Sequence, residues 1–107
     1  MDRKIEEAKE IIKEEVEKAG LKVVKIILFG SRIRGDYKED SDWDFYVVVD
    51  KDIKFNEMKK LIGKIQLRLA ELNLPNDLIL RGINQFEKAK KIVGNISYYA
   101  AKEGIEI

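Results

Sequence analysis

Two long stretches of the chain repeat apolar residues at steps of three and four, the period of an α-helix with one buried face. The first extends from Asp2 to Ala19 and ends before Gly20, a residue that readily adopts the left-handed conformation that often follows a helix. The second extends from Lys54 to about Asn73, and Pro75 prevents its continuation. The pattern predicts two amphipathic helices, each of which buries one face against another layer of the fold.

Three other apolar segments lack the helical period. Val23 to Phe29 and Trp43 to Val49 are short, nearly continuous apolar runs rich in β-branched and aromatic residues, which favours buried strands. Asp77 to Leu80 is a shorter third strand. Between the first two strands, Arg32 to Asp40 is polar and predicts a short helical turn followed by a loop.

The last part of the chain returns to a helical pattern. Gln85 to Glu103 is predicted to be helical in two pieces, with a joint at Gly94-Asn95. We expect Gly104 to cap the second piece and Ile105–Ile107 to extend outward. Tyr98-Tyr99 is either a partner-facing patch or core filling, and the usual half-burial of tyrosine favours core filling.

The predicted order is helix, strand, turn, strand, helix, strand, helix. This order indicates an α+β fold, a small mixed β-sheet flanked by helices. The sequence has 107 residues, which fits a single domain spanning residues 1–107 with a modest core.

Composition then limits the chemistry that this sequence can perform. It contains no Cys and no His, which excludes disulfides, thiolate nucleophiles, imidazole bases and the usual zinc ligands. Charged residues make up 38% of the sequence, yet the net charge is only +1, so we expect no direct binding to nucleic acid or a membrane. No signal peptide or membrane-spanning run is evident, and a cytoplasmic protein is the expectation. Enrichment in Lys and Glu resembles that of hyperthermophile proteins.

A candidate anion site follows the first predicted strand. Gly30-Ser31 ends the strand abruptly, at a point where free backbone N–H groups can bind an anion. Gly30 lets a phosphate approach the backbone closely, and the Ser31 hydroxyl can donate a further hydrogen bond. Arg32 and Arg34 come next and are either phosphate clamps or ordinary exposed charges. By itself, the glycine–serine pair is also consistent with a plain turn.

A pair of carboxylates begins the second predicted strand. Asp42 and Asp44 are separated by one residue, so their side chains point to the same face, while Trp43 and Phe45 point the other way, into the core. Two adjacent carboxylates repel each other unless a cation such as Mg²⁺ lies between them. The alternative is a solvated acidic turn, since further acidic residues precede the pair.

Asp77 opens the third strand after Pro75-Asn76, where it is either a turn residue or a third carboxylate. If the third strand lies beside the second, Asp77 joins Asp42 and Asp44. A phosphate cradle, two metal ligands and a third carboxylate suit a two-metal transfer of a phosphoryl or nucleotidyl group. Because His is absent, Asp77 is the candidate for binding the second ion or accepting the proton of the attacking hydroxyl.

The combination of Gly30-Ser31, ten intervening residues and Asp42-Trp43-Asp44 resembles the signature of the DNA polymerase β-like nucleotidyltransferases. The sequence around it, from Phe29 to Asp44, is similar to that of the minimal nucleotidyltransferases, or MNT proteins. The resemblance covers nearly the whole chain, and the combined motif is far more specific than either half. It implies the corresponding fold, a small mixed sheet flanked by helices.

The resemblance also implies a role for each motif residue. ATP would be the substrate, and its triphosphate would be held by Gly30, Ser31 and Arg34. A two-ion Mg²⁺ site would be formed by the catalytic residues Asp42, Asp44 and Asp77.

Many MNT proteins are antitoxins paired with a HEPN-domain ribonuclease toxin, and in such pairs they adenylylate a tyrosine of the toxin. The resemblance therefore implies a Mg²⁺-dependent enzyme that transfers AMP from ATP to a HEPN partner within a hetero-oligomer. The alternative is a binding module, an antitoxin that neutralises its toxin by masking it. The intact set of three carboxylates favours the enzyme.

Overall fold

In a computed structural model that describes residues 2–107, four strands form one mixed sheet in the order β3-β2-β1-β4. Strand β2 pairs antiparallel with β1 and parallel with β3, and β4 pairs antiparallel with β1. The strands are β1 (Val23–Phe29), β2 (Trp43–Val49), β3 (Asn76–Gly82) and β4 (Ile105–Glu106).

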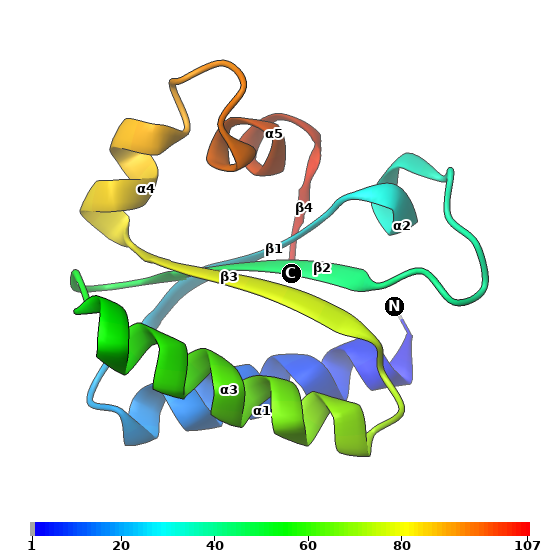
Figure 1. Cartoon of the computed structure of the whole chain (residues 1–107), viewed down its shortest axis with the longest axis horizontal. Helices are drawn as coiled ribbons and strands as arrows, with labels where there is room; N and C mark the ends of the chain where they lie inside the picture. The colour runs from blue at the N-terminus through cyan, green and yellow to red at the C-terminus, as the bar shows by residue number, and fades with distance from the viewer. Residues whose placement is uncertain (1) are drawn as a thin grey trace.

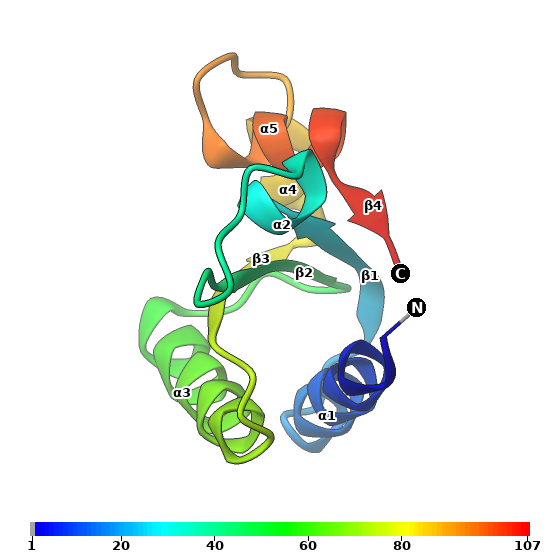
Figure 2. The same ribbon diagram turned by 90° about the vertical axis from the view of Figure 1, so that its right-hand side faces the viewer.

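Helices cover both faces of the sheet. Helices α1 and α3 lie side by side on one face, and α4 and α5 cover the other, with the short α2 beside the end of β1 (Figures 1 and 2). Their bounds are α1 (Arg3–Lys18), α2 (Ser31–Arg34), α3 (Phe55–Glu71), α4 (Ile83–Ala89) and α5 (Ile96–Glu103). The predicted α+β class is confirmed.

Local sequence explains where α1 begins and ends. The Asp2 side chain accepts a hydrogen bond from the Lys4 amide at 2.8 Å, which satisfies one of the free N–H groups of the first turn. Gly20 has a φ of +80°, as predicted for the residue that follows a helix. On the face toward α3, the buried Glu15 carboxylate accepts a 2.7 Å hydrogen bond from Arg68 and so joins the two helices.

The alternation of side chains along β2 divides the core between the two faces. Phe45 and Val47 are fully buried against α1 and α3, where most of the apolar side chains gather. Tyr46 and Val48 are fully buried in a smaller cluster beneath α4 and α5. Since side chains two positions apart share a face, Asp44 lies on the same face as Tyr46, next to the smaller cluster.

The expectation that Ile105–Ile107 extends outward is wrong, because Ile105 and Glu106 pair with β1 as an edge strand. Ile105, Glu106 and Ile107 alternate apolar and polar, but three residues are too few for this alternation to predict a strand. Gly104 makes the pairing possible, since a Cβ atom there would overlap Ile27 of β1. Gly104 is the C-cap of α5, as predicted, and its N–H donates to the Ala100 carbonyl at 3.0 Å, but its φ of −76° is not left-handed.

Two further boundaries differ from expectation. Strand β3 extends to Gly82, beyond the predicted end at Leu80, because it pairs with β2 along its whole length. The joint in the last helical region is wider than predicted and covers residues 90–95. Within residues 2–107, no helix combines the length and apolar character needed to cross a membrane.

Candidate active site

Three strand ends meet at one edge of the sheet. Because β1 and β2 are antiparallel, the end of β1 lies beside the beginning of β2, and Phe29 pairs with Asp44. Because β2 and β3 are parallel, their beginnings lie together, and Asp44 pairs with Asp77. The glycine turn that follows β1 and the aspartates of β2 and β3 are therefore neighbours, although they are distant in sequence.

Gly30 and Asp44 are in close contact at this edge. Gly30 has a φ of +80°, a conformation that other residues adopt only with strain. A Cβ atom at this position would overlap the Asp44 carboxylate. Glycine is thus required at position 30 for two reasons: the backbone conformation of the turn and the close approach of the Asp44 side chain.

Asp44 lies in an unfavourable electrostatic environment. Burial raises the pKa of its carboxyl group, and the nearby carboxylates of Asp77 and Asp42 raise it further. The positive charge of Arg34 partly opposes this increase. The ionised form of Asp44 is therefore less stable here than in water, and a cation in the site would stabilise it.

A cavity of about 510 Å³ opens at this edge. Five of its lining residues are those expected from the sequence to bind nucleotide or metal. The whole lining consists of Phe29, Gly30, Ser31, Arg34, Asp44, Asp77, Ile96, Tyr99 and Glu103.

Asp42 does not line this cavity. It is exposed at the end of the loop before β2 and affects Asp44 through its charge. Across the described range, 2–107, no three His, Cys, Asp or Glu side chains are close enough together to hold a metal ion. The placement of Asp42, Asp44 and Asp77 as joint metal ligands therefore stays a prediction.

The two arginines after Ser31 have different surroundings. Arg34 lines the cavity and forms an exposed ion pair with Asp36, with 3.4 Å between Nε and Oδ1. Because both partners are largely exposed, this pair leaves the guanidinium group free to exchange Asp36 for an anion in the cavity. Arg34 is thus placed where a phosphate clamp is needed.

Arg32 points away from the cavity into the loop that precedes β2. Its guanidinium group donates hydrogen bonds to the carbonyl oxygens of Ser41 at 3.0 Å and Glu39 at 2.9 Å. It also lies over the rings of Tyr37 and Trp43, 4.6 and 5.0 Å from their centroids. These contacts give Arg32 a structural role in holding the loop.

Helix α5 contributes residues that were not singled out from the sequence as part of the site. Ile96, Tyr99 and Glu103 line the same cavity as the glycine turn and the two aspartates. Core filling is the wrong interpretation for Tyr99, whose side chain remains 43% exposed. The helical period of this segment identifies a shared face but not the element that it faces, so the sequence alone carries no signal for this placement.

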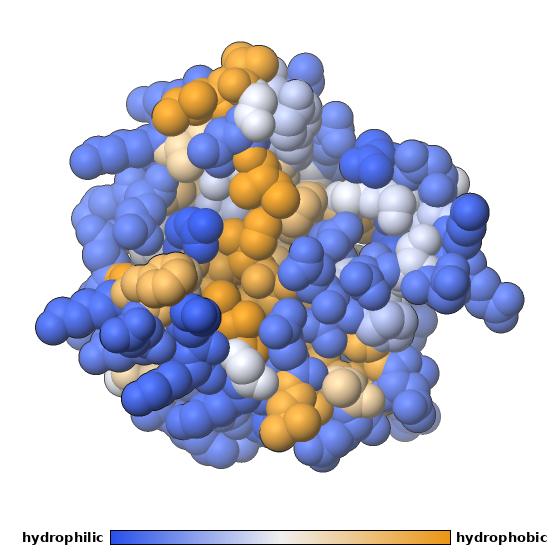
Figure 3. Space-filling model, in the orientation of Figure 1, coloured by the Kyte–Doolittle hydropathy of each residue, from blue (hydrophilic) through white to orange (hydrophobic). Residues whose placement is uncertain are grey.

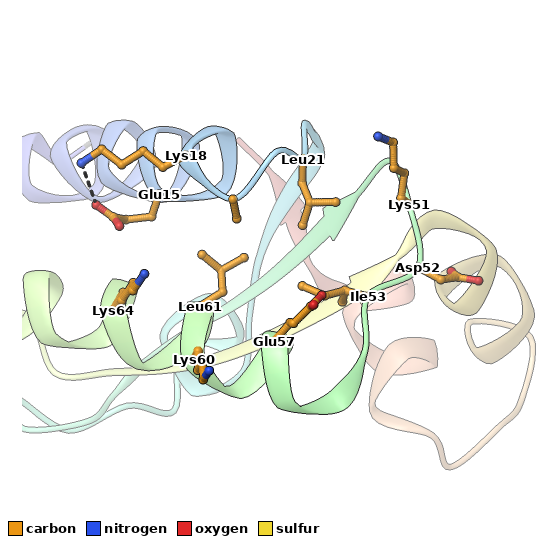
Figure 4. A pocket seen from close by; sticks show the side chains of 11 residues that line it. Glu15, Lys18, Leu21, Lys51, Asp52, Ile53, Glu57, Lys60, Leu61 and Lys64 are labelled. Atoms are coloured by element: carbon orange, nitrogen blue, oxygen red, sulfur yellow. Dashed lines mark hydrogen bonds and ion pairs between the residues drawn. The ribbon is translucent and has the colours of Figure 1, made fainter.

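A second cavity, of about 360 Å³, lies between α1 and α3 near the opposite end of β2 (Figure 4). Its polar side chains are mixed in charge, and Lys18 and Glu15 form an ion pair in its wall. It has neither a glycine turn nor paired aspartates. The residues with candidate chemistry are at the other cavity.

Comparison with known proteins identifies both the domain type and the fold. Residues 5–101 match the nucleotidyltransferase domain family. A putative protein adenylyltransferase of Methanocaldococcus jannaschii is 53% identical over 34 residues, which are 32% of this chain and 34% of that protein. The chain thus matches about a third of the length of this relative.

Two solved structures have a similar fold. A crystal structure of the toxin–antitoxin MntA-HpeT in mutant form superposes with a TM-score of 0.60 and 14% identity, covering 94% of this chain and 69% of the other. A crystal structure of a toxin–antitoxin with AMP-PNP gives a TM-score of 0.59 and 19% identity, covering 91% and 69%. At these identities the similarity shows the fold.

Proposed function

Since the chain belongs to the nucleotidyltransferase domain family, we propose that it transfers AMP from ATP to a tyrosine hydroxyl of a partner HEPN toxin. The observation that carries the proposal is the meeting of Gly30, Asp44 and Asp77 at one open cavity. A nucleotidyl transfer needs a phosphate cradle and carboxylates within one site, and this edge of the sheet has both.

The triphosphate is assigned to the side of the cavity formed by the turn after β1. Gly30 leaves the backbone open to close approach, and Ser31 adds a hydroxyl donor. Arg34 supplies a positive charge for the phosphate oxygens. Together these groups hold the nucleotide with its α-phosphorus toward the aspartates.

The acidic side of the site fits Mg²⁺. Asp44 and Asp77 offer carboxylate oxygens, which Mg²⁺ prefers, and their mutual repulsion is relieved by a cation. We assign Asp44 and Asp77 as ligands from the cavity wall and Asp42 as a third ligand from the adjoining loop. When bound, Mg²⁺ supplies charge neutralisation at the phosphates and lowers the pKa of the attacking hydroxyl.

We assign to Asp77 the role of binding the acceptor hydroxyl group. Asp77 is exposed at the mouth of the cavity, where a hydroxyl of another molecule can reach it. In the transfer, the tyrosine oxygen bonds to the α-phosphorus of ATP, the bond from that phosphorus to the pyrophosphate oxygen breaks, and pyrophosphate leaves. Asp77 orients the hydroxyl and accepts its proton.

The names of similar proteins support the choice of nucleotide and acceptor. The relative from M. jannaschii is called a putative protein adenylyltransferase. One structural neighbour is a toxin–antitoxin with AMP-PNP, an ATP analogue. The other neighbour is a toxin–antitoxin mutant in which two aspartates are changed to glutamate. Those two aspartates are separated by one residue, which is also the spacing of Asp42 and Asp44. We identify the toxin as a HEPN protein from the resemblance of the motif to MNT antitoxins.

The experiment measures transfer of AMP from ATP labelled at the α-phosphate to the partner protein that co-purifies with this chain from its native host. Wild-type protein with Mg²⁺ is expected to label one or more toxin tyrosines, located by mass spectrometry. Asp44→Asn and Asp77→Asn are expected to lose transfer, whereas Asp40→Asn, an exposed change in the preceding loop, retains it.

Toxin neutralisation is measured beside labelling. A wild-type chain that neutralises the toxin without labelling it would support the masking antitoxin and overturn the enzyme. Equal labelling by wild type, Asp44→Asn and Asp77→Asn would remove both aspartates from the catalytic site.

A further inference from the structure

Helix α5 presents one face to the cavity and another to the core. Ile96, Tyr99 and Glu103 follow each other at steps of three and four, so they project from one side of the helix, and all three line the cavity. Ser97 and Ala100, on the adjoining side of the helix, are buried in the core. The helix is therefore fixed by its buried face, with the cavity-facing side chains left accessible.

The cavity is divided into a charged side and an apolar side. Arg34, Asp44 and Asp77 form the charged side, as described above, and Glu103 adds one carboxylate from α5. Ile96 and Tyr99 form much of the apolar side and remain 46% and 43% exposed. Exposed apolar side chains beside a charged site lose the free energy of burial unless a ligand covers them.

The surface beyond this face is also apolar. Ile92 and Val93, in the connection between α4 and α5, are 58% and 74% exposed. Figure 3 shows apolar side chains gathered at the top of the molecule, over this connection. Ile92 and Val93 do not line the cavity, so they provide matched controls for Ile96 and Tyr99.

We propose that Ile96 and Tyr99 form the platform that binds the base of the nucleotide, an inference that rests on the proposed function. A nucleoside triphosphate has an anionic end and a flat aromatic end, and the two sides of the cavity match these two ends. The cavity volume of about 510 Å³ is in the range that accommodates such a ligand. Tyr98 packs against Tyr99 at 85°, with 5.3 Å between ring centroids, and thereby restrains the Tyr99 ring.

This platform predicts the class of nucleotide that binds best. Stacking uses the face of the base and does not distinguish the hydrogen-bonding groups at its edge. The stacking energy increases with ring area, so purine nucleotides bind more tightly than pyrimidine nucleotides. ATP and GTP are therefore both ligands, and UTP is a weaker one.

The test separates binding of the base from binding of the phosphates. Affinities for ATP, UTP and inorganic tripolyphosphate are measured by calorimetry, all with Mg²⁺. Tyr99→Ala is expected to weaken ATP binding about tenfold and to leave tripolyphosphate binding unchanged. Tyr99→Phe keeps the aromatic face and binds ATP as the wild type does. The preference for ATP over UTP decreases in Tyr99→Ala.

Ile96→Ala is expected to weaken ATP binding by a smaller factor, and Ile92→Ala to leave all three affinities unchanged. Thermal melts confirm that each variant is folded. Two results would contradict the platform and leave the proposed function standing. In one, Tyr99→Ala weakens the binding of ATP and of tripolyphosphate equally; in the other, it weakens the binding of neither ligand. If the wild-type protein binds neither ATP nor tripolyphosphate, the proposed function fails as well.

Discussion

Asp44 of β2 and Asp77 of β3 occupy paired positions of a parallel ladder, so two carboxylates lie next to each other at the edge of the sheet. Burial disfavours the ionised form of Asp44, and the neighbouring Asp77 carboxylate disfavours it further. The protein therefore maintains a locally unfavourable arrangement at the place where its candidate chemistry is concentrated.

Replacing Asp44 with Asn is expected to raise the melting temperature by a few degrees in the absence of Mg²⁺ while transfer falls about a hundredfold or more. The folded state raises the pKa of Asp44, so its ionised form destabilises the fold at neutral pH. The gain from Asn is full above the raised pKa and disappears below about pH 4, where Asp44 is protonated in both states. Melts from pH 3 to pH 8 check this, and a lower melting temperature for Asp44→Asn at pH 7 would contradict it.

Gly30→Ala is expected to destabilise the protein more than Gly20→Ala. Both glycines have a φ of +80°, so both substitutions introduce backbone strain of about 1–2 kcal/mol. Only at Gly30 does the new Cβ overlap a neighbour, the Asp44 carboxylate, whereas nothing lies within 4 Å at Gly20. Urea denaturation of the two variants measures the difference, expected to be on the order of 1–3 kcal/mol. Adding Asp44→Ala to Gly30→Ala should recover part of this loss, and equal destabilisation at the two glycines would count against the contact.

Arg34→Gln is expected to impair phosphate binding, whereas Arg32→Gln is expected to lower the stability of the fold. Arg34 lines the cavity, so its loss should weaken tripolyphosphate binding about tenfold with little change in stability. Arg32 holds the loop through the carbonyl groups of Ser41 and Glu39, so its loss should cost about 1–2 kcal/mol of stability. Calorimetric titration and urea denaturation of both variants separate these roles. The assignment is reversed if Arg32→Gln has the larger effect on phosphate affinity.

Glu15→Gln is expected to lower stability at neutral pH by about 1 kcal/mol and to have less effect in acid. The hydrogen bond from Arg68 lowers the pKa of Glu15 in the folded protein, with a smaller contribution from the charge of Lys18. The pair therefore stabilises the fold fully above the ordinary glutamate pKa of about 4.3 and loses this effect as pH falls through the lowered value. Denaturation at pH 7 and pH 3 checks the trend. Glu10→Gln, an exposed change on the same helix, is the control.

The strands that were best predicted from sequence are those with continuous β-branched and aromatic runs. The bounds of β1 and β2 agree with the prediction because these strands are mostly apolar on both faces and are flanked by polar residues or glycine. Strand β4 has two exposed residues, and its pairing depends on contacts of Gly104 with distant parts of the chain. The local sequence pattern does not indicate contacts between distant segments, so this strand was not predicted.

The candidate site was predictable where a residue's place follows from its own strand. Gly30 and Asp44 lie at strand ends, and the local pattern is enough to place them. Asp77 required the condition that β3 lies beside β2, which the sheet fulfils. Tyr99 depends on how α5 packs across the sheet, a relationship between elements that no single segment encodes.

The parallel pairing of β2 with β3 also has a kinetic consequence. Parallel strands cannot be joined by a tight turn, and here the chain must close the long connection that contains α3 to align β3 with β2. The two aspartates therefore meet only after the slow, non-local closure of the chain. A cation captured between them would act on the completed fold and not on its precursors, so it would slow unfolding and leave the folding rate unchanged. The lifetime of the folded molecule would then be set by the ion concentration around it.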